Sequence, residues 1–245
     1  MWYTSGSIWV GLIDEKMKIK KTKPPTYYPI FLRLQGKNCV VIGGGNVALR
    51  KVKGLLACGA KVTLISPTPH PEIVKLSKKR AIHLIQRDYE KEDLEDAAIV
   101  FACTDVKKVN RKVAEDAKKA GILVNVADDP RSSGFIIPSF FRRGNLTIAV
   151  STAGASPALA RIIRTNLEKS FGKEYALLLS IVGEIRSAMK KKGIILGAEA
   201  WQEVLDLDSL IQLLQAGQQK KVKTYLMDKL KVHPSSRWIN FKVRK

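Results

Sequence analysis

Residues 37–60 read KNCVVIGGGNVALRKVKGLLACGA, and this stretch decides the fold of the chain. Residues 39–42 form a short apolar run rich in β-branched side chains, which is typical of a buried strand. Three glycines follow, and after them apolar residues recur on one face of a predicted helix, whereas Arg50, Lys51 and Lys53 lie off that face. A strand, a glycine turn and an amphipathic helix in this order are typical of an α/β fold with a parallel sheet.

The glycines also match a fingerprint for dinucleotide binding. Gly43, Gly45 and Ala48 fit the pattern G-x-G-x-x-[GA]. The first glycine permits a tight turn, the second lets the backbone approach a pyrophosphate, and the small third residue lets the helix pack on the strand. The free N–H groups at the start of the helix suit a diphosphate. We therefore predict a bound dinucleotide, with a plain glycine turn as the alternative. The predicted contacts are Gly43, Gly44, Gly45, Asn46 and Val47.

Strands and helices continue to alternate outward from this stretch to about residue 130. Strands are expected at residues 30–34, 61–65, 83–86, 99–103 and 123–126, and helical segments at 72–80, 90–94 and 107–120. This alternation requires right-handed crossovers and a parallel, Rossmann-like sheet. The pattern then changes to a smaller part with strands and helices. Strands are expected there at 134–138 and 145–151, and helices from Ser156 and at 174–192, 207–216 and 222–230.

The composition bounds the class of protein. The chain has 245 residues, of which 45% are apolar and 27% charged, as in an ordinary soluble globular protein. No apolar run approaches the roughly 20 residues of a membrane helix, so we expect no membrane association. The three cysteines lack C-x-x-C spacing and favour reduced, buried thiols in a cytoplasm. The three histidines have no metal-site spacing either, so no bound metal is expected.

The net charge of +21 implies an acidic partner. Nucleic acid, an anionic membrane and a strongly acidic small molecule all fit such a balance. Much of the excess lies after Gly217, where Asp228 is the one acid, so a solvated basic tail explains it equally well. Nucleic acid is disfavoured, because no recognition motif with its required context is visible.

Polar residues follow several of the expected strands, at the sheet edge where open α/β folds bind ligands. Asp128 follows the fifth strand and could accept a proton as a general base, although its surroundings are also good turn chemistry. Thr104 and Asp105 suit contacts with nicotinamide or ribose, and Asp105 could equally cap the next helix. Ser66 and Pro67 follow the second strand, where many NAD proteins carry an acid for the ribose.

A second polar stretch, residues 151–157, precedes a predicted helix. Its hydroxyls, small residues and backbone N–H groups form a candidate cradle for substrate carboxylates. The alternative is an ordinary helix start with a serine cap and a proline in the first turn. The candidate contacts are Ser151, Thr152, Gly154 and Ser156.

A collinear series of motifs across about residues 27–170 resembles the precorrin-2 dehydrogenase family, of the sirohaem-synthase N-terminal type, in which some members are also sirohydrochlorin ferrochelatases. The motifs are YPIFL from Tyr28, VIGGGNVALRK from Val41, ACTD from Ala102, NVADDP from Asn125, FIIPS from Phe135 and STAGASPALAR from Ser151. The resemblance implies an NAD-dependent oxidation of precorrin-2 to sirohydrochlorin, in sirohaem biosynthesis. The preference for NAD over NADP rests on this resemblance alone.

The resemblance also implies roles and partners. Asp128 corresponds to the family's catalytic aspartate and Asp129 ranks second, while Asn125 becomes a candidate substrate contact. The substrate carries eight carboxylates, which a basic protein attracts. A homodimer is implied as well. Two alternatives stay open: an enzyme that also inserts Fe²⁺ as a second substrate, and a non-catalytic NAD-sensing or nucleic-acid-binding Rossmann protein.

Together these patterns predict five parts of the chain. They are an N-terminal extension (1–26), an NAD-binding Rossmann-like domain (27–130), a small β dimerisation region (131–165), a helical domain (166–232) and a basic tail (233–245).

Overall fold

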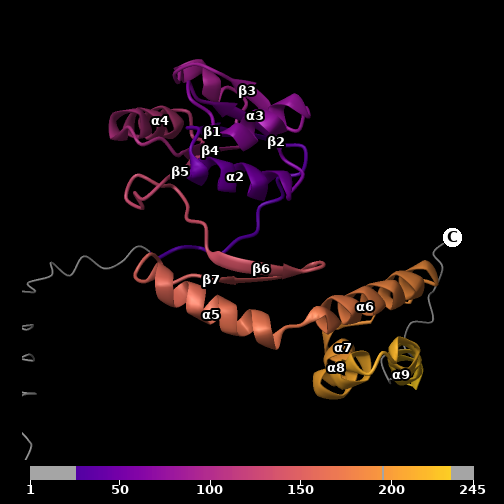
Figure 1. Cartoon of the computed structure of the whole chain (residues 1–245). Coiled ribbons are helices and arrows are strands. Elements are labelled where there is room, and N and C mark those ends of the chain that lie inside the picture. Colours follow the sequence, from indigo (N-terminus) through magenta and orange to yellow (C-terminus); the bar gives the residue numbers. More distant parts are fainter. Residues whose placement is uncertain (1–25, 195, 233–245) are drawn as a thin grey trace, which may run out of the picture. The chain divides into compact units, whose positions relative to one another are not determined.

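The computed structural model describes residues 26–194 and 196–232 (Figure 1). These residues divide into two compact units, with the boundary between Ile136 and Ile137. The first unit holds a five-stranded sheet, and the second holds a two-stranded sheet and several helices. The predicted basic tail and all but the last residue of the predicted N-terminal extension lie outside the described residues.

The first unit is the predicted Rossmann-like sheet. Its strands are β1 (Asn38–Ile42), β2 (Lys61–Ile65), β3 (His83–Ile85), β4 (Ile99–Ala102) and β5 (Leu123–Val126), and its helical elements are α2 (Asn46–Leu56), α3 (Pro71–Lys78), η1 (Lys91–Leu94) and α4 (Lys107–Lys119). All pairs are parallel, in the order β3-β2-β1-β4-β5. From β1 the chain first adds β2 and β3 on one side and then β4 and β5 on the other. The topological switch point therefore lies between β1 and β4, and ligands of open parallel sheets bind at such a point.

Both faces of this sheet are covered. Cys39 and Val41 of β1 pack in one core with α2 and α3, whereas Val40 and Ile42 pack in a second core with α4. Successive residues of a strand point to opposite faces, so a strand buried on both sides reads as an uninterrupted apolar run. This is the physical reason that residues 39–42 could be recognised as a strand.

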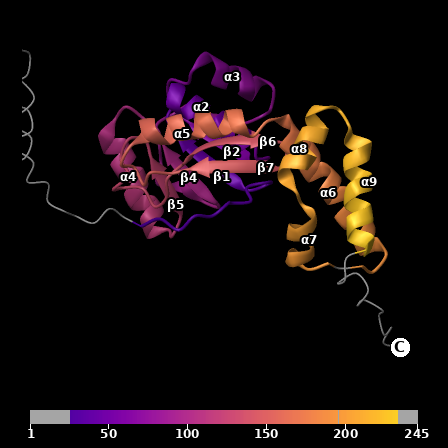
Figure 2. The same ribbon diagram turned by 90° about the horizontal axis from the view of Figure 1, so that it is seen from below.

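The second unit begins with an antiparallel hairpin. β6 (Ser139–Arg143) pairs with β7 (Leu146–Val150), and α5 (Pro157–Ser170) contacts both strands. Figure 2 shows the next four helices gathered together: α6 (Lys173–Lys191), α7 (Ala198–Val204), α8 (Leu207–Gln215) and α9 (Gln219–Val232). Leu178, Leu210 and Leu226 belong to their common core. Helix α7 was not expected from the sequence.

Two predicted strands are wrong. Residues 30–34 are irregular and pair with no described strand. Ile30 and Phe31 in this segment are 58% and 76% exposed, so these apolar side chains, which suggested a strand, do not pack in the core. Residues 134–138 are also irregular, and β6 begins only after Pro138, which has no N–H to donate to a strand ladder. Among the described residues, no helix is long and apolar enough to span a membrane.

Candidate active site

The glycine turn brings three strand ends together. Gly43 has φ +116°, and a Cβ atom there would lie 2.5 Å from the carbonyl oxygen of Cys103 after β4. A Cβ atom on Gly44 would lie 2.5 Å from Oγ of Ser66 after β2. Only glycine permits these two close approaches. Gly43, the first glycine of the fingerprint, and Gly44, which follows it, are therefore needed by the packing of the protein itself.

Gly45 differs, because the space beside it is open. A Cβ atom there would meet no atom within 4 Å. Gly45 is the N-cap residue of α2, and no side chain accepts a hydrogen bond from the first N–H groups of that helix. Asn46 and Val47 form the first turn of α2. An open surface next to free N–H groups fits a diphosphate, so the residues present are suited to a dinucleotide.

The predicted cofactor contacts after β2 and β4 have defined partners. Ser66 is buried, and its Oγ accepts a hydrogen bond from the N–H of Thr68, 3.3 Å away. Pro67 lies between them. Thr104 is tied to α4 by Asn110, whose Nδ2 donates to the Thr104 carbonyl (2.8 Å) and whose Oδ1 accepts from the Thr104 hydroxyl (2.8 Å). These bonds fix the chain where it leaves β4.

Asp105 does not cap α4. The N-cap residue is Val106, and no side chain caps the helix. The capping alternative for Asp105 is therefore wrong, while its contact with a cofactor stays a prediction. Asp105 is exposed.

Asp128 and Asp129 follow β5 and differ sharply in their surroundings. The Asp129 carboxylate accepts hydrogen bonds from the N–H of Arg131 (3.1 Å), the N–H of Ser132 (3.3 Å) and the Ser132 hydroxyl (2.7 Å). The Ser132 bonds hold the pKa of Asp129 below its usual range. The exposed Asp128 carboxylate accepts no hydrogen bond from any described residue, and its backbone is left-handed with φ +59°. Asp tolerates this conformation in turns, so the turn alternative stays open, while the unengaged carboxylate is available for a functional role.

Lys51 is a member of the site that the sequence analysis missed. Its Nζ donates to Oδ1 of Asn125 (3.3 Å) and lies 5.1 Å from the ring centroid of Phe101. Burial lowers the pKa of Lys51, and the nearby Cys103 and Asp128 act against that shift. Asn125, a predicted substrate contact, is buried and also donates from Nδ2 to the carbonyl of Phe135 (3.0 Å). Both the oxygen and the nitrogen of the Asn125 amide thus have hydrogen-bond partners within the protein.

One sequence signal could have found Lys51. Val47 and Leu55 stand four residues before and after it, one helical turn away on each side. This spacing places Lys51 at the border of the buried face rather than in open solvent.

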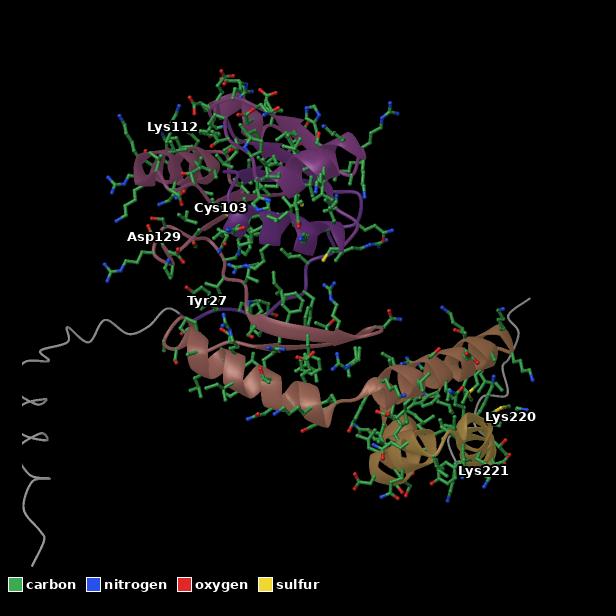
Figure 3. The ribbon with its side chains drawn as sticks, in the orientation of Figure 1. Tyr27, Cys103, Lys112, Asp129, Lys220 and Lys221 are labelled. Carbon is green, nitrogen blue, oxygen red and sulfur yellow. The ribbon has the colours of Figure 1, made fainter. Side chains whose placement is uncertain are left out.

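Asp128 borders a hollow of about 260 Å³. Lys107 and Arg111 of α4 also line it. Asp129, labelled in Figure 3, comes from the loop after β5 and also lines it. The complete lining is Lys107, Asn110, Arg111, Val126, Ala127, Asp128, Asp129 and Ser132. The hollow therefore joins the predicted catalytic carboxylate to two cations.

The predicted anion cradle lies in the second unit and has the structure of a capped helix start. Oγ of Ser156 accepts from the N–H of Leu159 (3.2 Å), which confirms the predicted cap. The Thr152 hydroxyl donates to the Ser156 carbonyl (3.0 Å), and Oγ of Ser151 accepts from the N–H of Ala153 (3.1 Å). Gly154 adopts φ +86°. Substrate binding by these residues stays a prediction.

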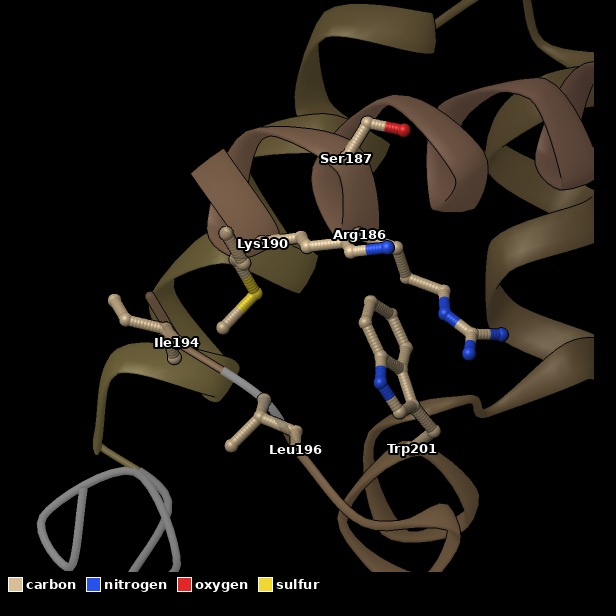
Figure 4. Close-up of a pocket in the computed structure, with 7 residues that line it drawn as sticks. Arg186, Ser187, Lys190, Ile194, Leu196 and Trp201 are labelled. Carbon is tan, nitrogen blue, oxygen red and sulfur yellow. The ribbon is translucent and has the colours of Figure 1, made fainter. Parts of the chain in front are cut away.

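A separate hollow of about 370 Å³ lies between α6 and α7, and Figure 4 shows it. Arg186 lies beside Trp201 there, with 5.8 Å between the guanidinium carbon and the ring centroid. None of the predicted site residues lines this hollow. Within the part of the chain that the structure describes, no group of His, Cys, Asp and Glu could hold a metal ion.

Comparisons with known proteins agree with this architecture. Residues 30–139 match a family model for NAD(P)-binding, and residues 143–170 match one described as "Sirohaem biosynthesis protein central". "Siroheme synthase 1" of Aeromonas salmonicida is 37% identical over 193 residues, which cover 78% of this chain and 41% of that protein. "Siroheme synthase" of Nitrosococcus oceani is 37% identical over 199 residues, or 80% and 42%. The chain thus spans about two fifths of the length of these relatives.

A solved structure extends the likeness to three dimensions. "SirC, precorrin-2 dehydrogenase" is similar with a TM-score of 0.68 and 28% identity, over 82% of this chain and 100% of that chain. The likeness covers the parallel sheet, the hairpin and the helical region together. The chain is therefore similar to SirC over that protein's whole length and to the sirohaem synthases over about two fifths of theirs.

Proposed function

We propose that this protein is an NAD-dependent precorrin-2 dehydrogenase, which oxidises precorrin-2 to sirohydrochlorin in sirohaem biosynthesis. One observation carries the proposal: the open surface at Gly45 and the unengaged Asp128 carboxylate both lie at the carboxyl ends of the strands of one parallel sheet. The likeness to SirC over that protein's whole length supports the choice of substrate.

The reaction removes a hydride and a proton from the substrate. NAD, when bound, accepts the hydride. The start of α2 holds the pyrophosphate with its free N–H groups, and Thr104, fixed by Asn110, shapes the edge beside it. Asp128 accepts the proton, because its carboxylate has no competing hydrogen-bond donor among the described residues. Lys51 interacts electrostatically with this carboxylate.

Further parts of the proposal concern cofactor choice, assembly and location. NAD rather than NADP is the cofactor, with Ser66 in the place of the usual acid after β2.

The protein is a homodimer, and the exposed Phe140, Leu159 and Ile162 of the hairpin and α5 offer apolar surface for the contact. It acts in the cytoplasm. Sedimentation equilibrium measures the assembly state, and a monomer at micromolar concentration would contradict the dimer.

Insertion of Fe²⁺ is the second candidate activity. A carboxylate at the position of Asp128 could also take pyrrole protons as a metal enters a tetrapyrrole. Iron is then a substrate that touches the protein only transiently.

The test is a direct assay of the purified chain. Precorrin-2 and NAD are mixed with the protein, and the absorbance of sirohydrochlorin and of NADH is followed with and without Fe²⁺. We expect NADH and sirohydrochlorin to form together, in equal amounts. No NADH above an enzyme-free control would overturn the proposal, and a further iron-dependent spectral change would support the second activity.

A further inference from the structure

We propose that Lys107 and Arg111 bind carboxylate groups of the substrate beside Asp128. This inference rests on the proposed function and names the residues that select its acidic substrate. Both residues lie on α4, four positions apart and hence on one face, and both line the hollow that Asp128 and Asp129 also line. Two carboxylates and two cations thus line the hollow.

The two cations have no partner among the described residues. Neither Lys107 nor Arg111 makes a hydrogen bond or an ion pair there, and both are exposed. Two other cations of the same unit do have acidic partners, since Lys53 pairs with Glu72 and Arg87 with Asp93. Asp129 also lines the hollow, but its carboxylate already accepts a hydrogen bond from the Ser132 hydroxyl. Two positive charges are therefore available to a ligand.

The position of Lys107 is unfavourable for the helix itself. The N-terminal end of a helix carries a partial positive charge, so a cation in the first turn destabilises it. The first turn of α4 has no acid, and Arg111, one turn further on, repels Lys107. Lys108 shares the first turn, so it is the lining of the hollow that singles out Lys107 and Arg111.

The shape and charge of the hollow define the ligand. A volume of about 260 Å³ is small for a whole drug-sized ligand and suits one or two acidic arms of a larger molecule. A guanidinium binds a carboxylate through two parallel hydrogen bonds, and a lysine adds a compact charge. The two carboxylates of the lining repel a simple anion. The site thus fits a polycarboxylate that also presents N–H donors, as an octacarboxylate tetrapyrrole does.

The experiment compares two double variants with the same loss of charge. Lys107→Gln/Arg111→Gln removes the two cations of the lining, and Lys108→Gln/Lys119→Gln removes two exposed lysines of the same helix that do not line the hollow. Binding of uroporphyrin, an octacarboxylate porphyrin, is titrated by fluorescence. Steady-state kinetics then give KM for precorrin-2, KM for NAD and kcat.

We expect the Lys107/Arg111 variant to weaken uroporphyrin binding and raise KM for precorrin-2 by about 10-fold or more. Its KM for NAD and its kcat stay within about 2-fold of wild type, and its Tm is unchanged or higher, because unfavourable charges are gone. The control variant behaves as wild type. Equal losses in both variants would overturn the inference, since general attraction would explain them.

Failure of this inference and failure of the proposed function give different results. If wild type oxidises precorrin-2 and the Lys107/Arg111 variant is indistinguishable from the control, only the proposed carboxylate site is refuted. If wild type binds uroporphyrin through Lys107 and Arg111 but does not oxidise precorrin-2, only the assigned reaction is refuted. Wild type that neither binds uroporphyrin nor oxidises precorrin-2 overturns both.

Discussion

At the scale of single residues, the contrast between Asp128 and Asp129 matters most. The two acids are adjacent in the sequence, and sequence reasoning could rank them only through a family resemblance. In the structure Asp129 is engaged by Arg131 and Ser132, whereas Asp128 is unengaged and has a left-handed backbone. The bonds of Asp129 are local, to residues two and three positions later, but which of the two adjacent acids makes them depends on the path of the loop.

Asp128→Asn should therefore lower kcat by at least about 100-fold, because an amide cannot accept the proton. NAD affinity and Tm stay near wild type, since the Asp128 carboxylate makes no hydrogen bond to the described residues. Asp129→Asn is the matched comparison: it weakens the loop bonds to Ser132 and lowers Tm more than it lowers kcat. The variants are compared by steady-state kinetics, NAD titration and thermal unfolding. Full activity of Asp128→Asn would remove Asp128 from the mechanism.

Gly45→Asp should weaken NAD binding by about 10-fold or more, because the new carboxylate crowds and repels the pyrophosphate. The fold should survive, since a Cβ atom at Gly45 meets open space. Gly54→Asp in the same helix, also in open space, is the control with the same charge change. Calorimetric titration with NAD measures both. Unchanged affinity in Gly45→Asp would argue against the assignment of the cofactor site.

Buried thiols should make the stability of the protein fall at high pH. Burial raises the pKa of Cys39 and that of Cys103 to about 11, from an ordinary value of 9.0. The folded state then keeps protons that the unfolded state releases, so stability is lost as pH rises from about 9 to 11. The loss is at most about 3 kcal/mol for each thiol.

Urea unfolding at pH 8.5 and pH 11 measures this effect. Cys103→Ala should be less stable than wild type at both values and should lose less stability between them. Lys51 is present in both proteins, and its lowered pKa acts in the opposite sense. Because Cys103 raises the pKa of Lys51, removal of this thiol lowers that pKa further, which adds to the smaller loss expected of the variant. An identical pH dependence in both proteins would contradict the prediction.

At the scale of elements, local patterns predicted most of the fold. β1, β2, β4 and β5 were found because strands buried on both faces are short apolar runs, and α4 ends before Gly121, whose φ is +69°. The segment at 30–34 had the composition of a strand, but its apolar residues Ile30 and Phe31 stay exposed instead of packing on the sheet. Helix α7 was missed because its seven residues are too few to establish a helical period.

The start of α5 gives a test at this scale. Ser156→Ala should lower the free energy of unfolding by about 1 kcal/mol, because the N–H of Leu159 loses its acceptor. Ser180→Ala, at an exposed site within α6, should change it little. Urea unfolding measures both. A parallel rise in KM for precorrin-2 in Ser156→Ala would support the predicted anion cradle, whereas an unchanged KM would leave only the cap.

At the scale of the whole molecule, the net charge of +21 should act on the encounter with an acidic substrate. Raising NaCl from about 50 to 500 mM shortens the Debye length and screens this attraction. We expect KM for precorrin-2 to rise more steeply with salt than KM for NAD, because the tetrapyrrole carries more negative charge. Steady-state kinetics at several NaCl concentrations measure how each KM depends on salt. Equal dependences of the two KM values on salt would show that the charge serves another partner.

The sequence by itself determined the parallel sheet, the glycine turn and the position of Asp128 after a strand. Each of these follows from residues close together in the chain, where spacing directly encodes conformation. Only the tertiary structure decided that Lys51 contacts Asn125, and that Lys107 and Arg111 share a hollow with Asp128. Lys51 of α2 reaches Asn125 of β5 because the strand order places β4 and β5 beside β1, and α4 contacts both β4 and β5. Contacts between distant segments depend on that order rather than on local pattern.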